Sequence, residues 1–154
     1  MRNLIIPALT KHLLLLALLW WLPAWTSADI VVVTNLENPV ASLSTKEVRK
    51  VFLGRLHLYP GTEHEPLAID QPQGSDAYRE FYDVVIGISL PKLKRYRAYY
   101  LFSGKGKVPY MADSQQAVVD SIQRSTFAIG YLVQPDKELL SKVKVVYRQS
   151  TPPQ

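Results

Sequence analysis

A short buried strand that leads into a helix constrains the fold of this chain more than any other feature. Pro66 to Asp70 is an apolar segment of strand type, and it lies between a helix that stops at Gly54 and a second helix that begins at Ser75. The small residues before and at this helix start suit a tight turn and a helix cap. Such a strand–turn–helix unit leaves backbone N–H groups unpaired at the helix start, where an anion can bind.

The rest of the chain continues this alternation of strands and helices. Strands are predicted at 29–34, 66–70, 127–133 and 143–147, and the first is a continuous β-branched run that is typical of a strand buried on both faces. Helices are predicted after caps at Ser44, Ser75, Ser89 and at Asp113 or Ser114. Because helical crossovers separate the strands, the sequence predicts an α/β fold with a mostly parallel sheet and helices on both faces.

One helix start is specified by a local motif. Ser44 and Glu47 have the spacing of a capping box, in which each residue's side chain accepts a hydrogen bond from the other residue's backbone N–H. Val48, Val51 and Phe52 form the predicted inner face of this helix, and Gly54 ends it.

The first 28 residues have the pattern of a signal peptide. Basic residues precede an apolar core from Leu13 to Leu22, which is about half of the ~20 residues that a membrane-spanning helix needs. Small residues then lead to a predicted cleavage site after Ala28. We therefore predict one periplasmic domain at 29–148, a flexible tail at 149–154 and no transmembrane anchor once the leader is cleaved, although an uncleaved N-terminal anchor is the alternative.

Composition narrows the classes of function. The leader carries two of the 18 Lys and Arg residues and none of the 13 acidic residues, so the predicted mature chain has a net charge of only +3. This small excess gives no basis for nucleic-acid binding. Cysteine is absent, which excludes a lipid-modified N-terminus and thiolate metal sites. No catalytic set, metal site or cofactor motif stands out, so we do not expect an enzyme.

Three segments of the chain point together to one known family. They are Val31 to Asn35 with the helix that ends at Val51 to Gly54, the pair Gly74-Ser75 with Phe81, and Phe127 to Leu132. These segments resemble the substrate-binding proteins of phosphate ABC transporters, in the type 2 periplasmic-binding-protein superfamily. The segments match one lobe of the two-lobed family members. The resemblance therefore implies a short, single-lobe relative that binds phosphate or another small oxyanion, with a transporter or sensor protein as a partner.

The resemblance places the ligand at the start of the helix that follows the predicted strand. Its implied binding residues are Gln71, Gly74, Ser75, Asp76 and Ala77. The family has an arginine where this chain has Gln71, and glycine and threonine where it has Asp76 and Ala77. An acid at position 76 disfavours an anion, because two like charges ~4 Å apart repel by about 4 kcal/mol at an effective dielectric constant near 20. The alternative is that Ser75 is an ordinary helix cap.

Two further features have both a functional and a structural interpretation. Ser103, Lys105 and Lys107 lie in a glycine-rich loop that is a candidate secondary anion site, or else a solvated turn after a helix. Lys92, Lys94, Arg95 and Arg97 are predicted to make one helix basic on its outer side, next to a dense set of tyrosines. The alternative function is therefore a ligand-free protein-interaction module that docks onto a sensor, transporter or envelope component, and a solvated helix face is the simplest explanation of the charges.

Overall fold

The structure is a computed structural model that describes residues 29–104 and 106–150. The predicted signal peptide at 1–28 lies outside these residues, as do Lys105 and residues 151–154. None of the helices in the described part of the chain has the length and apolar character needed to cross a lipid bilayer.

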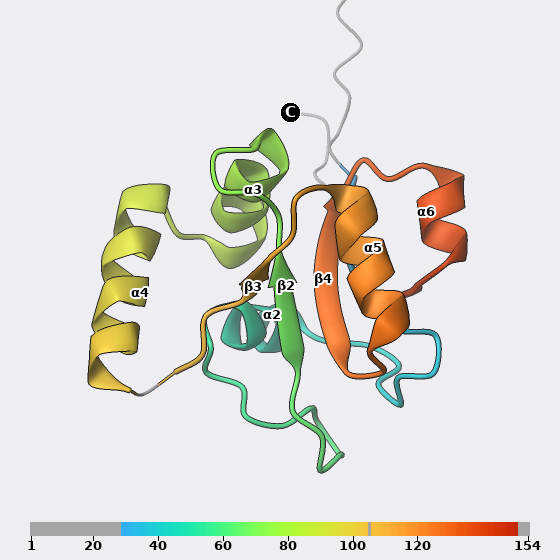
Figure 1. Cartoon of the computed structure of the whole chain (residues 1–154), viewed down its shortest axis with the longest axis horizontal. Coiled ribbons are helices and arrows are strands. Elements are labelled where there is room, and N and C mark those ends of the chain that lie inside the picture. Colours follow the sequence, from blue (N-terminus) through green and yellow to red (C-terminus); the bar gives the residue numbers. More distant parts are fainter. Residues whose placement is uncertain (1–28, 105, 151–154) are drawn as a thin grey trace, which may run out of the picture.

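The centre of the fold is a five-stranded sheet with the strand order β3-β2-β4-β1-β5 (Figure 1). Its strands are β1 (Asp29–Thr34), β2 (Leu67–Asp70), β3 (Tyr110–Met111), β4 (Ala128–Val133) and β5 (Lys144–Ser150). Strand β2 pairs in parallel with β3 and β4, whereas β1 is antiparallel to both β4 and β5. Only β1 is reversed among the described strands, so the predicted mostly parallel sheet is confirmed.

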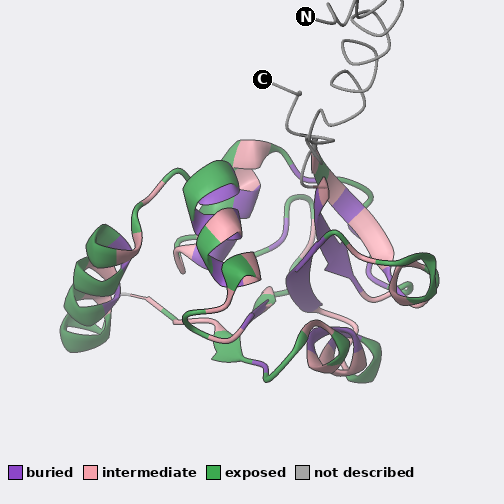
Figure 2. Cartoon of the chain, turned by 90° about the horizontal axis from the view of Figure 1, so that it is seen from above, coloured by how far each residue is buried: buried purple, intermediate pink, exposed green. Residues whose placement is uncertain are grey.

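Helices cover both faces of the sheet, as predicted. The helices are α2 (Thr45–Phe52), α3 (Asp76–Glu80), α4 (Leu90–Ser103), α5 (Gln115–Arg124) and α6 (Lys137–Ser141), and α3 continues into a π-helical segment, η2 (Phe81–Ile86). Helices α2 and α3 lie on one face with η2, and α5 and α6 lie on the other (Figure 2). Helix α4 stands at the edge of the molecule, on the β3 side of the sheet (Figure 1).

Strand β1 is buried on both faces, which confirms the expectation from its β-branched run. Ile30 and Val32 pack in the core on the α2 side, and Val31 and Val33 pack in the core on the α5 side. All four side chains have no exposed area. Because successive side chains of a strand point to opposite faces, an unbroken apolar run is what a central strand between two helical layers requires.

The capping box is present as predicted. The backbone N–H of Ser44 donates to the Glu47 carboxylate at 2.7 Å, and the Glu47 N–H donates to the Ser44 hydroxyl at 3.3 Å. One boundary was wrong: β5 extends to Ser150, so Gln149 and Ser150 of the predicted tail pair with β1 in the sheet. The short elements β3 and α6 were not predicted.

Three aromatic rings join the helical layer to the sheet in the larger core. The rings of Phe81 and Tyr131 are stacked, with centroids 3.6 Å apart and an interplanar angle of 4°. The ring of Phe52 meets both of them edge-on, at centroid distances of 4.8 and 5.5 Å. All three residues have no exposed area, so this cluster ties α2, η2 and β4 together.

Truncation of Phe52 tests this cluster. Because Phe52→Ala removes a fully buried ring that both partner rings contact, we expect a loss of about 3–5 kcal/mol in the free energy of unfolding. Urea unfolding monitored by circular dichroism measures this loss. Val84→Ala is the control, because Val84 is 39% exposed and its truncation is expected to cost about 0.5 kcal/mol or less. A loss for Phe52→Ala as small as that of the control would contradict the central role of the cluster.

Candidate functional site

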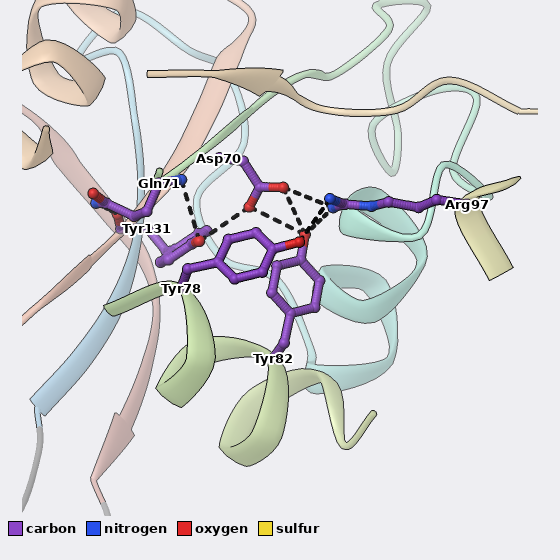
Figure 3. Close-up of polar contacts among 6 residues, drawn as sticks. All are labelled: Asp70, Gln71, Tyr78, Tyr82, Arg97 and Tyr131. Carbon is purple, nitrogen blue, oxygen red and sulfur yellow. Dashed lines mark hydrogen bonds and ion pairs between the residues drawn. The ribbon is translucent and has the colours of Figure 1, made fainter. Parts of the chain in front are cut away.

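The carboxyl end of β2 carries a buried acid. Asp70 is the last residue of β2 and has no exposed area. Ligands in open α/β sheets bind beyond the carboxyl ends of the strands, which makes this edge the natural place for a site. One Asp70 oxygen accepts a hydrogen bond from the Tyr131 hydroxyl of β4 at 3.0 Å, and both accept from the Tyr82 hydroxyl of η2 at 3.0–3.1 Å (Figure 3).

Arg97 of α4 completes an ion pair with this acid. Its Nη2 lies 2.6 Å from the Asp70 carboxylate and also donates to the Tyr82 hydroxyl at 2.5 Å. Its Nη1 donates to the Tyr78 hydroxyl of α3 at 2.9 Å. Arg97 is only 8% exposed, so the prediction that it belongs to the outer, basic side of α4 was wrong. The arginine turns inward because its charge has a buried partner.

Burial affects the pKa of the acid, the tyrosines and the arginine in this network. It raises the pKa of the Asp70 carboxyl, although the Arg97 guanidinium and the tyrosine hydroxyls act in the opposite direction. Burial also raises the pKa of Tyr82 and of Tyr131, so both hydroxyls stay protonated and can donate to the acid. Although burial acts to lower the pKa of Arg97, its neighbours, Tyr82 and Asp70 among them, raise it overall and keep the guanidinium charged.

Gln71 follows Asp70 directly and is also buried. Its side-chain Nε2 donates to the Tyr131 carbonyl at 3.0 Å, and its backbone N–H donates to the Tyr131 hydroxyl at 3.2 Å (Figure 3). Only 1% of the residue is exposed. The side-chain amide of Gln71, which the resemblance assigned to an anion, is therefore bound to β4. Only the other four predicted residues remain as candidates at the helix start.

Those four residues form the turn into α3. Gly74 has a φ of +89°, in the left-handed region that favours glycine, so it makes the reversal between β2 and the helix. Ser75 is the N-cap, and its hydroxyl accepts from the Tyr78 N–H at 3.1 Å. The N–H groups of Asp76 and Ala77 have no partner among the described residues, as expected for the first turn of a helix.

The acid in this turn is directed along the helix. The Asp76 carboxylate accepts from Nη1 of Arg79, one turn further on, at 2.9 Å, and its side chain is 93% exposed. The repulsion expected from Asp76 is therefore reduced, both by this arginine and by solvent screening. The sequence alone did not place Arg79 beside this charge.

The predicted secondary anion loop is not assembled by the described residues. Nζ of Lys107 is paired with the Glu65 carboxylate at 2.8 Å, and the Ser103 hydroxyl donates to the Tyr100 carbonyl at 3.3 Å. Lys105 lies outside the described residues. The segment is instead packed against Gly54, where an added Cβ would lie 2.3 Å from the Lys107 carbonyl oxygen. Elsewhere in the described chain, no group of three or more His, Asp or Glu residues is placed to hold a metal ion.

Comparison with known proteins gives the fold. No model of a known protein family matches the sequence, and no curated protein matches it significantly. Among solved structures, the chain is similar to an ABC-type phosphate transport receptor from Vibrio cholerae, with 16% identity and a TM-score of 0.57 over 78% of this chain and 46% of that one. It is also similar to PstS from Borrelia burgdorferi, with 15% identity and a TM-score of 0.62 over 83% of this chain and 50% of that one.

The chain shares its fold with part of these solved structures. It spans about half the length of the solved structures that it matches. At this level of identity the likeness establishes the fold and leaves the ligand to be argued from the residues of this chain. The predicted resemblance in fold is confirmed.

Substitution of the ion pair tests what holds α4 in place. Asp70→Asn or Arg97→Met alone leaves a buried charge unpaired, so each is expected to cost about 3–5 kcal/mol of unfolding free energy. The double variant is expected to cost clearly less than the sum, because it leaves neither charge behind. Urea unfolding of all four proteins measures the coupling.

The exposed Asp76–Arg79 pair is the matched control for this cycle. Arg79→Met is expected to change the unfolding free energy by about 0.5 kcal/mol or less, because exposed ion pairs contribute little. If the loss of unfolding free energy in the double variant equals the sum of the losses in Asp70→Asn and Arg97→Met, the two residues are not a coupled buried pair.

Proposed function

We propose that this protein binds phosphate or another small oxyanion in the periplasm, in a role linked to phosphate uptake or sensing. The proposal places the anion at the start of α3, at residues 74–77. The observation that carries it is the pair of unpaired N–H groups of Asp76 and Ala77, which face outward from the first turn of a helix that continues through η2. The fold supports the same assignment, because one of its solved neighbours is described as an ABC-type phosphate transport receptor.

The groups at this turn can hold an anion without a dedicated cation. The two N–H groups donate hydrogen bonds, the Ser75 hydroxyl supplies a third polar group, and the helix dipole favours negative charge at this end. Hydrogen bonds to a charged partner contribute about 1.5–3 kcal/mol each, and the remaining Asp76 repulsion offsets part of that gain. The described residues also include no second domain that could close over the ligand. We therefore expect a dissociation constant in about the millimolar range.

Two substitutions at position 76 separate charge from hydrogen bonding. Asp76→Ala removes the carboxylate and keeps the N–H, so it is expected to tighten phosphate binding several-fold. Asp76→Pro removes both, and proline is accepted at the first position of a helix after an extended residue such as Ser75, whose ψ is 152°. Isothermal titration calorimetry with millimolar phosphate is the measurement, and the proline variant is expected to bind more weakly than the alanine variant. Equal binding by the two variants, or no heat with any of the proteins, would overturn the site.

A second candidate function has an observation of its own. Lys92, Arg95, Tyr99 and Phe102 follow one another at helical spacing on α4, and all are exposed, with Phe102 92% exposed. Arginine and large aromatic side chains are enriched in protein-binding surfaces, and this stripe combines both. On this hypothesis the lobe docks onto a sensor, transporter or envelope component through α4, without a ligand.

Charge reversal in this stripe tests the interaction module. Arg95→Glu combined with Phe102→Ser is expected to abolish cross-linking between the protein and its envelope partner, because both changes lie on an exposed helix face and leave the core intact. Photo-cross-linking from position 99 in an envelope preparation measures the contact. Lys46→Glu, on the exposed side of α2, is the matched control. An unchanged cross-linking pattern in the double variant would contradict the docking role of α4.

A further inference from the structure

A groove separates α4 from the rest of the molecule. It has a volume of about 480 Å³ and lies between α4 and the segments that hold Gly74, Tyr78 and Val108. This volume is within the range of small-molecule sites, which are commonly ~300–1,000 Å³. The groove exists because α4 contributes only two buried residues, Leu93 and Arg97, to the body of the protein.

The groove has an apolar wall and a cationic side. Its apolar lining from α4 consists of Leu90, Leu93, Ala98 and Leu101. Leu101 is 61% exposed, so an apolar surface remains available beside the groove. Arg97 and Lys94 line the same groove and supply its positive charge.

Arg97 lines this groove with a guanidinium that is not fully hydrogen-bonded. Its Nη1 and Nη2 are bound to Tyr78, Tyr82 and Asp70, but its Nε has no hydrogen-bond partner and is the one such buried side-chain atom in the described part of the chain. Buried polar groups are nearly always paired, so the guanidinium has unused hydrogen-bonding capacity. Nε itself has almost no accessible area, so a ligand in the groove meets the charge of Arg97 rather than this N–H. Lys94, one turn earlier on α4, is exposed and has no ion-pair partner among the described residues.

We propose that this groove binds a small amphipathic anion, a molecule with one carboxylate or phosphate head group on an apolar chain or ring. The head group accepts a hydrogen bond from Lys94 Nζ and lies beside the Arg97 guanidinium, and the tail covers the apolar wall of α4. This inference does not rest on the oxyanion site at the start of α3, because its donors are side chains of a different helix. Most of the Arg97 charge is balanced by Asp70, so the tail is needed for measurable affinity.

Three probe compounds separate the head group from the tail. Octanoate carries both parts, acetate carries only the head group, and 1-octanol carries only the tail. Because the tail removes apolar area from water, octanoate is expected to bind at least about tenfold more tightly than acetate. It is also expected to bind more tightly than 1-octanol, which has no charge for the two cations. Calorimetric titration of the purified protein measures all three, and the absence of saturable octanoate binding overturns the proposal, as does equal affinity for acetate.

Two variants locate the binding in the groove. Ala98→Phe fills the space from an exposed position, and Lys94→Glu reverses the charge, so each is expected to weaken octanoate binding by about tenfold or more without loss of thermal stability. Lys92→Glu is the matched control, because Lys92 is exposed on the same helix and does not line the groove. Unchanged octanoate affinity in Ala98→Phe, or an equal loss in Lys92→Glu, overturns the assignment.

The Asp76→Pro variant distinguishes this site from the oxyanion site. It is expected to weaken phosphate binding and to leave octanoate affinity unchanged, because it removes a donor only at the start of α3. Loss of octanoate binding in this variant would overturn the assignment of the head group to Arg97 and Lys94. Failure of phosphate to bind any form of the protein, with octanoate binding intact, would reject the proposed function and leave the groove standing.

Discussion

The buried ion pair between Asp70 and Arg97 is the interaction on which the arrangement of this fold depends. It connects the end of β2 to α4, and tyrosine hydroxyls bring β4, α3 and η2 into the same network. Burying a charge costs free energy unless its hydrogen-bonding groups find partners. Here both carboxylate oxygens of Asp70 accept hydrogen bonds. Helix α4 buries only two of its residues, so the ion pair, together with the hydrogen bonds of Tyr96 to Leu53 and Arg55, fixes its position.

This mode of attachment explains the two faces of α4. The helix is held by a salt bridge, by Leu93 and by the hydrogen bonds of Tyr96. An apolar groove remains beneath it, and the proposed amphipathic ligand would occupy that groove. The opposite side of the helix carries exposed cations and aromatic side chains, which are the basis of the docking hypothesis. The start of α3, by contrast, is a capped turn in which the N–H groups of Asp76 and Ala77 have no partner among the described residues, and these groups are the basis of the oxyanion proposal.

Local sequence signals predicted much of the fold. The capping box at Ser44, the β-branched run at 29–34 and the cap at Ser75 each depend on neighbours within a few residues, and the structure has all three. The two-residue strand β3 was missed because so short a segment has no periodicity, and its strand pairing is with β2, about 40 residues earlier in the chain. The reversed direction of β1 was also beyond the sequence, since strand direction is a property of how the chain closes.

The candidate site also combines features that local sequence predicts with features that only the tertiary structure sets. The sequence by itself determined that a small-residue turn would follow a buried strand and begin a helix, because strand propensity and helix capping act over a few residues. The resemblance to phosphate-binding proteins, and not the sequence by itself, implied that Gln71 stands in the place of a binding arginine. Only the tertiary structure decided that Gln71 is engaged with β4 and that Arg97, in a run of surface cations, turns inward to Asp70. Their pairing spans 27 residues, and no local pattern encodes it, because it arises from the desolvation of one acid at the end of a central strand.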